Sequence, residues 1–232
     1  MKILAIDTSS SICSVAILED KKLIIEKNSN DEKTHSQKLL PLIDLTLSES
    51  NLSLNEINLI SCCIGPGSFT GIRIGVSTVK AFADASNIPI IGITSLESLA
   101  YNINKTGLVV SLIDAKNDNV YFSLHEHNEN GKYNLILDYC ADNIENILKK
   151  LETFSNRTLN FVGDGSIIHK EMICSKFKKI IFSDVKENIQ NSFSLGRIGF
   201  DKHLIGLSGN SNSISPIYLK KSQAERALNG EK

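Results

Sequence analysis

The segment GPGSFTGIRIG at residues 65–75 follows an apolar run at 59–64 and opens a helical pattern that continues to residue 86. Glycine after a strand permits positive φ angles, and a serine at the start of a helix can cap its free amide groups. The segment therefore predicts a strand–turn–helix junction with a helix N-terminus that could receive an anion. Its glycines follow the spacing G-x-G-x-x-x-G, which differs from the dinucleotide-binding fingerprint, and the lysine of a P-loop is absent. This spacing favours a plain structural junction over a phosphate site.

The same order of elements is predicted twice along the chain, with this junction inside the first copy: three strands, a helix, a strand, a helix and a strand. In the first half, the expected strands are 3–7, 14–18, 23–27, 59–64 and 88–93, and the expected helices are 36–50 and 68–86. In the second half, the expected strands are 109–114, 119–125, 135–140, 159–163 and 179–183, and the expected helices are 143–152 and one that follows the turn at 163–165. The first strand of each half ends in Ile-Asp before a polar turn, which supports a duplicated unit.

This repetition predicts an α/β protein of two lobes, each with a central mixed β-sheet flanked by helices, as in the actin-like/Hsp70-like (ASKHA) fold. The expected lobes are residues 1–104 and 105–232. A final helix at 194–207 and a tail at 216–219 follow the second unit and are assigned to the second lobe.

The composition is that of a chain with nearly balanced charge. It has 232 residues, of which 25 are Lys or Arg and 26 are Asp or Glu, and its formal net charge is −1. Sequence-independent RNA binding needs an excess of basic residues, so direct RNA contact is ranked below protein contact. The chain starts in a strand and has no apolar run near the roughly 20 residues that span a bilayer, so a cytoplasmic protein without a membrane anchor is expected. Its five cysteines include no C-x-x-C pair, which disfavours a disulfide framework or a thiolate metal site.

Two helical segments form the candidate interaction surface. In the segment 68–86, Gly71 and Gly75 lie four residues apart, and Thr78 and Phe82 extend the same face. Each glycine costs about 1 kcal/mol relative to alanine inside a helix, and close approach of another helix would offset this cost. That second helix is either a partner's or one of the same chain.

The segment 36–50 carries apolar side chains around most of its circumference, whereas a helix that covers a single core needs only a stripe. These side chains are Leu39, Leu40, Leu42, Ile43, Leu45 and Leu47. Together the two segments predict a surface for a protein partner that includes Leu39, Ile43, Leu47, Gly71, Gly75, Thr78 and Phe82. Pro41 fits this helix only near its start or at a kink.

Other chemically active side chains favour structural roles. Asp7, with the two hydroxyl residues that follow it, stands where an actin-like enzyme directs a carboxylate toward nucleotide phosphate and metal, but a turn closed through its own backbone is favoured. His125 and His127 share a strand face, and their polar neighbours indicate a solvated hairpin end instead of a metal site. The remaining histidines are isolated, and no protease or hydrolase motif is present. No catalytic residue, metal or cofactor is therefore predicted.

The segment 65–75, followed by IPIIGITSLE at 88–97, resembles the bacterial TsaB family, also called YeaZ. Other landmarks occur in the same order, namely IDTS at 6–9, HS at 35–36 with LLP at 39–41, IDA at 113–115 and PIYL at 216–219. The resemblance covers nearly the whole chain and is strongest in the first hundred residues. Lys116 stands where the family usually carries arginine.

TsaB-like proteins are paralogues of TsaD, the enzyme that transfers threonylcarbamoyl from its adenylate to tRNA. The segments shared by the two families place the H-x-E-G-H metal motif of TsaD on residues 95–99, where Ser95 and Leu99 replace both histidines. These side chains cannot hold the ion in the same way. The resemblance therefore implies a non-catalytic scaffold subunit for threonylcarbamoyl modification of adenosine 37 (t6A37) in tRNAs that read codons beginning with A.

The resemblance also implies the partners of such a subunit. It would bind a TsaD-like catalytic paralogue and, with it, a TsaE-like ATPase, and it would contact tRNA only through that complex. Alone, it would form a homodimer through an overlapping surface. Two enzymatic alternatives stay open: an actin-like ATP-dependent phosphotransferase or ATPase that uses Asp7 and the turn at Gly65, and a glycoprotease-like peptidase.

Overall fold

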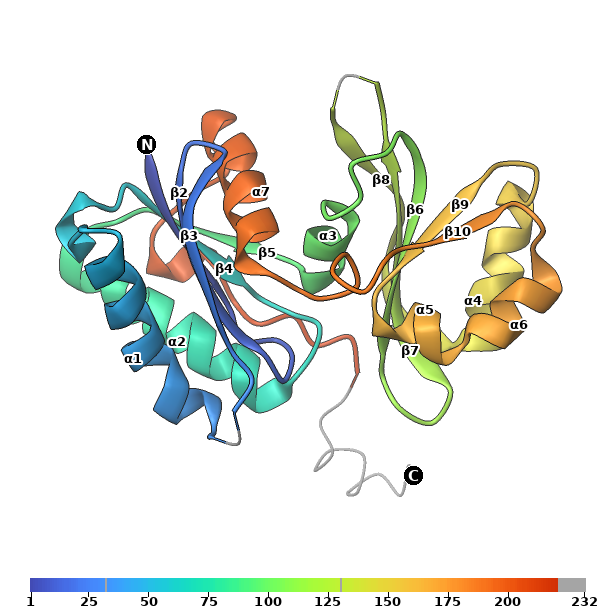
Figure 1. Ribbon diagram of the computed structural model, residues 1–232, viewed down its shortest axis with the longest axis horizontal. Coiled ribbons are helices and arrows are strands. Elements are labelled where there is room, and N and C mark those ends of the chain that lie inside the picture. The colour runs from blue at the N-terminus through green and yellow to red at the C-terminus, as the bar shows by residue number, and fades with distance from the viewer. Residues whose placement is uncertain (32, 130, 221–232) are drawn as a thin grey trace.

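Each half of the chain folds around a five-stranded mixed sheet, and a computed structural model describes residues 1–31, 33–129 and 131–220 (Figure 1). The strands of the first sheet are β1 (Lys2–Asp7), β2 (Cys13–Glu19), β3 (Lys22–Ser29), β4 (Leu59–Cys63) and β5 (Ile90–Ile93). Those of the second are β6 (Gly107–Asp114), β7 (Asn119–His127), β8 (Tyr133–Asn143), β9 (Leu159–Val162) and β10 (Ile180–Phe182).

The two sheets have the same topology. Their strand orders are β3-β2-β1-β4-β5 and β10-β9-β6-β7-β8. In each sheet the first three strands are antiparallel neighbours, and the last two run parallel to the first. The duplicated unit and the two-lobed α/β fold expected from the sequence are therefore confirmed.

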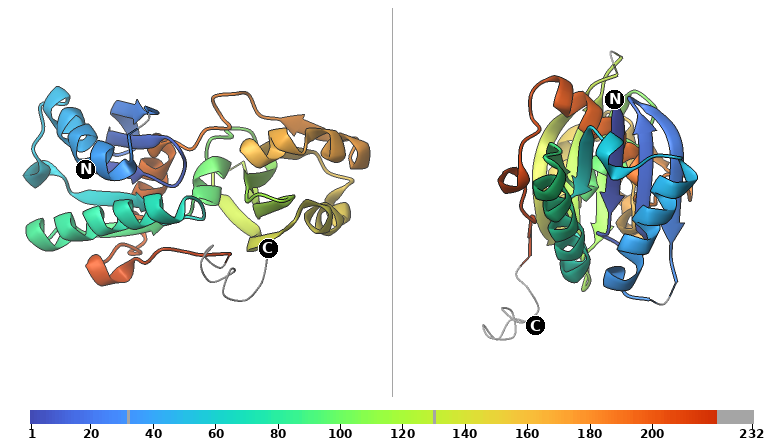
Figure 2. Two further views of the ribbon diagram at one scale, coloured as in Figure 1. Left: turned by 90° about the horizontal axis from the view of Figure 1, so that it is seen from below. Right: turned by 90° about the vertical axis from the view of Figure 1, so that its left-hand side faces the viewer.

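Helices cover both faces of each sheet. They are α1 (His35–Glu49), α2 (Phe69–Ser86), α3 (Ser95–Ala100), α4 (Ile144–Leu151), α5 (Asp164–Ile168), α6 (Lys170–Lys176) and α7 (Ser192–Leu204), with 3-10 turns η1 (Leu54–Glu56), η2 (Glu152–Phe154) and η3 (Ser211–Ser213). Helices α1 and α2 lie side by side on the outer face of the first sheet, and α4 and α6 lie at the far end of the second lobe (Figures 1 and 2). The single helix expected after the turn at 163–165 is two short helices, α5 and α6, that meet at His169.

Alternation along β1 gives the first sheet two apolar faces. Leu4 and Ile6 pack in the cluster formed with α1 and α2, whereas Ile3 and Ala5 pack in the cluster formed with α7. Successive side chains of a strand point to opposite faces, so this strand is apolar throughout because both faces are covered.

Helix α7 corrects the expected division of the chain. The sequence order places it in the second lobe, but it packs on β1, β2, β4 and β5 of the first sheet. The Ser192 hydroxyl donates to the carbonyl of Ser14 at 2.8 Å, and the Phe193 amide donates to Glu26 Oε1 at 3.0 Å. The chain therefore returns to the first lobe after β10, and residue 104 lies between β5 of the first sheet and β6 of the second.

The lobes are joined by α3 and by the segment 214–220. All six residues of α3 are buried, and Leu96 and Leu99 pack with Val109 of β6 in one cluster. In the second connection, Ile217 N donates to the carbonyl of Ile64 at 2.8 Å, and Lys220 Nζ donates to the carbonyl of Ala115 at 2.7 Å. No helix of the described residues is long and apolar enough to cross a membrane.

Candidate partner surface and the cleft between the lobes

The loop after β1 packs directly against the N-terminal part of α2. Asp7 closes the turn through its own backbone, because its Oδ1 accepts a hydrogen bond from the Ser9 amide at 2.8 Å. The Thr8 hydroxyl donates to the carbonyl of Gly71 at 2.8 Å, and the Ser68 amide donates to the carbonyl of Ser9 at 2.7 Å. The turn interpretation of Asp7 is confirmed, and the loop occupies the space in front of the helix.

The glycines of α2 make room for this loop. A Cβ at Gly71 would come within 3.0 Å of the Thr8 carbonyl oxygen, and a Cβ at Gly75 would come within 3.0 Å of the Thr8 hydroxyl oxygen. The sequence indicated that these glycines permit the close approach of another helix. The approaching segment is instead a loop of the same chain, so the premise for including Gly71 and Gly75 in a partner surface is corrected.

The N-terminus of α2 is capped by one of its own residues. Ser68 is the N-cap, and its hydroxyl accepts a hydrogen bond from the Gly71 amide at 3.2 Å. A Cβ at Gly67 would come within 3.0 Å of the Ser9 carbonyl oxygen, so backbone fills the place where an anion would approach. The structural junction favoured from the glycine spacing is what the structure shows.

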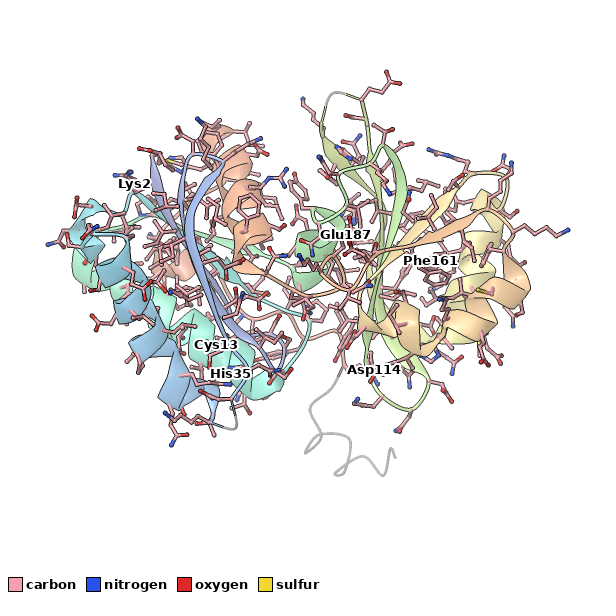
Figure 3. All side chains as sticks on the ribbon, in the orientation of Figure 1. Lys2, Cys13, His35, Asp114, Phe161 and Glu187 are labelled. Carbon is pink, nitrogen blue, oxygen red and sulfur yellow. The ribbon has the colours of Figure 1, made fainter. Side chains whose placement is uncertain are left out.

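Asp7 is enclosed. Its residue is 1% exposed, and burial raises the pKa of its carboxyl, against the opposing effects of Ser9, Cys63 and His35. Among the described residues, Asp7 Oδ2, Ser9 Oγ and His35 Nδ1 are buried without a hydrogen-bond partner of normal geometry. His35 and Cys13 lie at the same end of the first lobe, as labelled in Figure 3. The loop would have to move before this carboxylate could reach a nucleotide or a metal ion.

Asp114 ends the corresponding strand of the second sheet and differs in its environment. Its Oδ1 accepts from the Lys116 amide at 2.9 Å, and its Oδ2 pairs with Lys116 Nζ at 2.6 Å. Burial acts to raise the pKa of Asp114, but the hydrogen bonds and charge of Lys116 outweigh it and lower the pKa. Both turns therefore begin with the same hydrogen bond from the amide two residues after the Asp, but only Asp114 is paired with a lysine.

The positions aligned with the TsaD metal motif all lie in α3. The Ser95 hydroxyl donates to the carbonyl of Pro66, and Glu97 Oε2 accepts from Lys202 Nζ of α7 at 2.7 Å. Leu99 belongs to the apolar cluster between the lobes. Within 1–220, residues 32 and 130 aside, no three His, Cys, Asp or Glu side chains converge as metal ligands would. These positions hold the lobes together.

On α1, the structure corrects part of the predicted surface. Leu39 and Ile43 are 1% and 3% exposed and belong to the core beneath α1 and α2. Leu47 and Phe82 are half-buried at the edge of that core, and Thr78 is also half-buried. The apolar side chains of α1 that remain exposed are Leu40 and Leu45. The buried residues Leu39, Leu42, Ile43 and Thr46 form one stripe, and the sequence pattern did not resolve which leucines lie outside it.

Two exposed or half-buried positions were missed by the sequence reasoning. Leu40 is 54% exposed and precedes Leu47 by seven residues, so both lie on one side of α1. Ile74 is half-buried and lies four residues before Thr78 on α2. Ile74, Thr78 and Phe82 therefore form one stripe, and its apolar spacing was the available signal.

His125 and His127 are not at a solvated hairpin end, which corrects that interpretation. Both are buried, because β8 extends along β7 and its tyrosines cover them. His127 stacks on Tyr133 with ring centroids 4.1 Å apart, and its Nδ1 lies 3.0 Å from the Lys105 carbonyl oxygen. Burial, with a smaller effect from Lys202, lowers the pKa of His125 to about 4.

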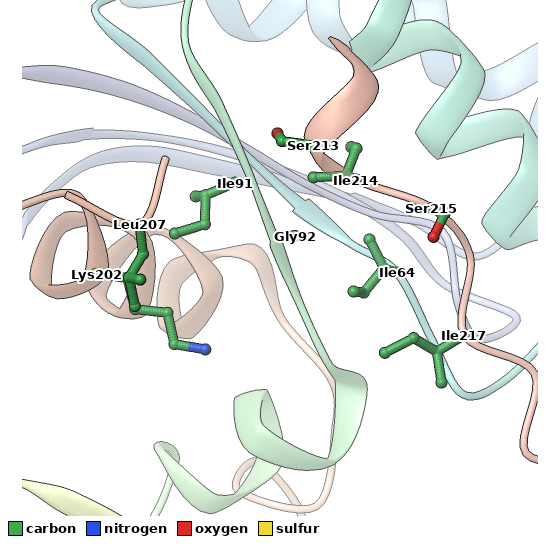
Figure 4. Close-up of a pocket in the computed structure, with 9 residues that line it drawn as sticks. All are labelled: Ile64, Ile91, Gly92, Lys202, Leu207, Ser213, Ile214, Ser215 and Ile217. Carbon is green, nitrogen blue, oxygen red and sulfur yellow. The ribbon is translucent and has the colours of Figure 1, made fainter. Parts of the chain in front are cut away.

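A pocket of about 280 Å³ lies beside the first sheet, between β5, the end of α7 and the segment that follows η3 (Figure 4). Ile64, Ile91 and Ile217 give it an apolar lining, and Lys202 stands at one side. None of the residues predicted for a site lines this pocket.

Known proteins share both the sequence and this architecture. A family model described as "TsaD: tRNA N6-adenosine threonylcarbamoyltransferase" matches residues 25–227. The chain is 31% identical to the "tRNA threonylcarbamoyladenosine biosynthesis protein TsaB" of Bacillus subtilis, over 97% of this chain and 96% of that protein. The chain belongs to the TsaB family. The TsaB of Haemophilus influenzae is 29% identical over 99% of this chain and 98% of its own length.

Solved structures agree with the TsaB family fold. The structure described as "YeaZ from Pseudomonas aeruginosa" superposes with a TM-score of 0.76 at 24% identity, covering 94% of this chain and 99% of that one. An inorganic polyphosphate/ATP-glucomannokinase from Arthrobacter sp. strain KM superposes with a TM-score of 0.52 at 10% identity, covering 87% of this chain and 99% of that one. The TsaB-family chain thus has the two-lobed ASKHA fold, which is shared with kinases of very different sequence.

Proposed function

We propose that this TsaB-family chain is a non-catalytic scaffold subunit of the cytoplasmic machinery that makes t6A37 in tRNA. It binds a TsaD-like catalytic paralogue and, through that complex, a TsaE-like ATPase. Membership in the TsaB family supports the role in threonylcarbamoyladenosine biosynthesis. A homodimer formed in the absence of the paralogue is part of the proposal.

The enclosed loop after β1 is the observation that supports a non-catalytic role. An enzyme of this architecture needs an accessible carboxylate and an open turn to receive nucleotide phosphates. Here Asp7 is 1% exposed, and the carbonyl of Ser9 takes the place in front of α2. The carboxylate of Glu97, in the region of the lost metal motif, is engaged by Lys202. The enclosure of Asp7 and the pairing of Glu97 both support a non-catalytic role.

The outer sides of α1 and α2 are the surface proposed for the paralogue. Leu40 and Leu47 on α1, with Ile74, Thr78 and Phe82 on α2, replace Leu39 and Ile43 of the sequence-based surface. Exposed or half-buried apolar side chains on adjacent helices fit a helix–helix contact between proteins. Buried core residues contribute to this contact only by holding the two helices in place.

Leu40→Asp tests this surface. An unpaired carboxylate in an apolar interface weakens the binding free energy by more than about 1.4 kcal/mol, so the affinity for the TsaD-like paralogue should fall at least about tenfold. Co-purification and calorimetry measure the affinity, and nucleoside mass spectrometry of tRNA from the complemented deletion strain measures t6A. The matched control is Leu135→Asp on β8, because Leu135 is 42% exposed in the wild type. This variant should keep both the affinity for the paralogue and the t6A level.

Equal complex formation by both variants would place the surface elsewhere. Normal t6A in a strain that lacks the gene would remove the proposed role itself. The purified wild-type chain is expected to show no micromolar binding of ATP with magnesium in calorimetry. Such binding with turnover would favour the phosphotransferase or ATPase instead.

A further inference from the structure

Basic side chains collect at the far end of the second lobe. Residues 149–179 contain seven Lys or Arg and three Asp or Glu, although the whole chain has a net charge of −1. The basic tip comprises six of them, all exposed: Lys149, Lys150, Arg157, Lys176, Lys178 and Lys179. The charge balance of the whole chain conceals this local excess.

Three segments bring the basic tip together. Lys149 and Lys150 lie in the last turn of α4, Arg157 precedes β9, and the others lie between the end of α6 and β10. The Leu159 amide donates to the carbonyl of Lys179 at 3.0 Å, and Lys179 Nζ donates to the carbonyl of Asn156 at 2.9 Å. These bonds join the loop before β9 to the loop before β10, and the pair of Lys176 with Glu152 places the end of α6 beside the residue that follows α4.

Neighbouring carboxylates neutralise only part of this charge. Lys150 pairs with Asp142 at 3.0 Å, Arg157 with Glu126, and Lys176 with Glu152 at 3.4 Å. Surface pairs of this kind contribute about 0–1 kcal/mol, so a polyanion can compete for these cations. Lys149 and Lys178 have no ion pair within the part of the chain that the structure describes.

We infer that the basic tip binds the phosphate backbone of tRNA. The identity of the RNA rests on the proposed function, in which tRNA is the molecule that is modified. Lys and Arg gain affinity for phosphates by releasing counterions and do not read bases, so this contact is independent of tRNA sequence. It replaces the expectation that tRNA is contacted only through the rest of the complex.

The position of the basic tip fits a subunit that holds two partners at once. Helices α4 and α6 lie at the opposite end of the molecule from α1 and α2 (Figure 1). A paralogue on α1 and α2 therefore leaves the tip uncovered. The second lobe extends the RNA-binding surface of the complex beyond the catalytic subunit.

Lys149→Gln/Lys178→Gln tests the inference, because neither side chain has a hydrogen bond or ion pair to lose among the described residues. Fluorescence anisotropy of labelled tRNA, at salt from 50 to 200 mM, measures how tightly tRNA is bound by this chain alone and by its mixture with the TsaD-like paralogue. The variant should bind on the order of tenfold more weakly, with a salt dependence shallower by about two units. Lys22→Gln/Lys105→Gln removes the same charge from exposed positions outside the tip and should bind normally.

Three results would overturn the inference. The tip and control variants could have equal tRNA affinity, or the wild type could fail to bind tRNA at 50 mM salt. In a parallel measurement with vesicles of anionic phospholipid, the tip variant could lose affinity for the vesicles while it binds tRNA normally. Co-purification with the paralogue separates this inference from the proposed scaffold role. The tip variant should keep the complex that Leu40→Asp loses. A tip variant that loses tRNA affinity while Leu40→Asp keeps the complex would support the tip and contradict the partner surface.

Discussion

Thr8 and Gly75 form a contact that explains why a glycine stands inside α2. Glycine in a helix interior is unfavourable, so its presence needs a local reason. Thr8 is 1% exposed and its hydroxyl is held by the carbonyl of Gly71 at 2.8 Å. A Cβ at position 75 would meet that hydroxyl oxygen within 3.0 Å. The glycine therefore fixes the loop after β1 against the helix and keeps Asp7 covered.

Gly75→Ala should lower stability despite the better helix propensity of alanine. Alanine gains about 1 kcal/mol from propensity, but overpacking against Thr8 costs about 1–3 kcal/mol, so a net loss of about 1 kcal/mol is expected. Urea denaturation measures it, with Ser77→Ala on the exposed face of α2 as the control. Thr8→Ala/Gly75→Ala should lose less than the sum of the single variants. If Gly75→Ala keeps the wild-type stability but binds the TsaD-like paralogue more weakly, Gly75 would belong to the partner surface.

Turn chemistry at Asp7 could be predicted, whereas the burial of single side chains could not. An Asp that accepts a hydrogen bond from the amide two residues later is a local arrangement, so the sequence contains what determines it. Leu39 and His125 are buried by other elements, respectively the first sheet and β8, so their burial depends on how the elements pack. The outward positions of α1 depend on how wide a core lies beneath it, which periodicity alone does not define.

For α7 too, the sequence predicts the order of the elements but not the surface on which the helix packs. The elements of both sheets could be predicted because apolar runs alternate with turn signals along the chain. Nothing local to α7 indicates that Leu195 and Ile198 pack on the first sheet. This placement follows from a long-range match, since the inner face of β1, β2 and β4 is apolar and the second lobe leaves it uncovered.

Helices α3 and α7 are joined by the pair Glu97–Lys202, which is partly buried at the junction of the lobes. The two charged atoms lie 2.7 Å apart, and their side chains are 11% and 29% exposed. A double-mutant cycle with Glu97→Gln and Lys202→Met should give a coupling energy of about 1 kcal/mol in urea denaturation. Asp142→Asn and Lys150→Met, an exposed pair of the second lobe, serve as the control cycle and should give less. Additive effects of Glu97→Gln and Lys202→Met would show that the pair does not link these helices.

The C-terminal segment contacts both α2 of the first lobe and the apolar cluster between the lobes. Tyr218 stacks on Phe69 with ring centroids 4.4 Å apart, and Arg73 Nε donates to the Tyr218 hydroxyl at 2.8 Å. One residue further, Leu219 packs in the cluster between the lobes. Two-lobed enzymes commonly close around a ligand by hinge motion. The proposed scaffold role would instead gain from a fixed geometry, which would keep two partners at a constant distance.

Tyr218→Ala should loosen the lobes without unfolding either sheet, because each sheet has its own core. Loss of the ring stack and of the hydrogen bond from Arg73 should speed hydrogen exchange in α3 and in the amide of Ile217, while the central strands β1 and β6 stay protected. Tyr218→Phe keeps the stack and loses the hydroxyl, so its exchange should lie between those of the wild type and Tyr218→Ala. If the amides of α3 exchange at equal rates in all three proteins, the C-terminal segment contacts both lobes but does not stabilise their relative position. In that case Glu97–Lys202 and the apolar cluster around α3 would be sufficient to fix the distance between the partner surface and the basic tip.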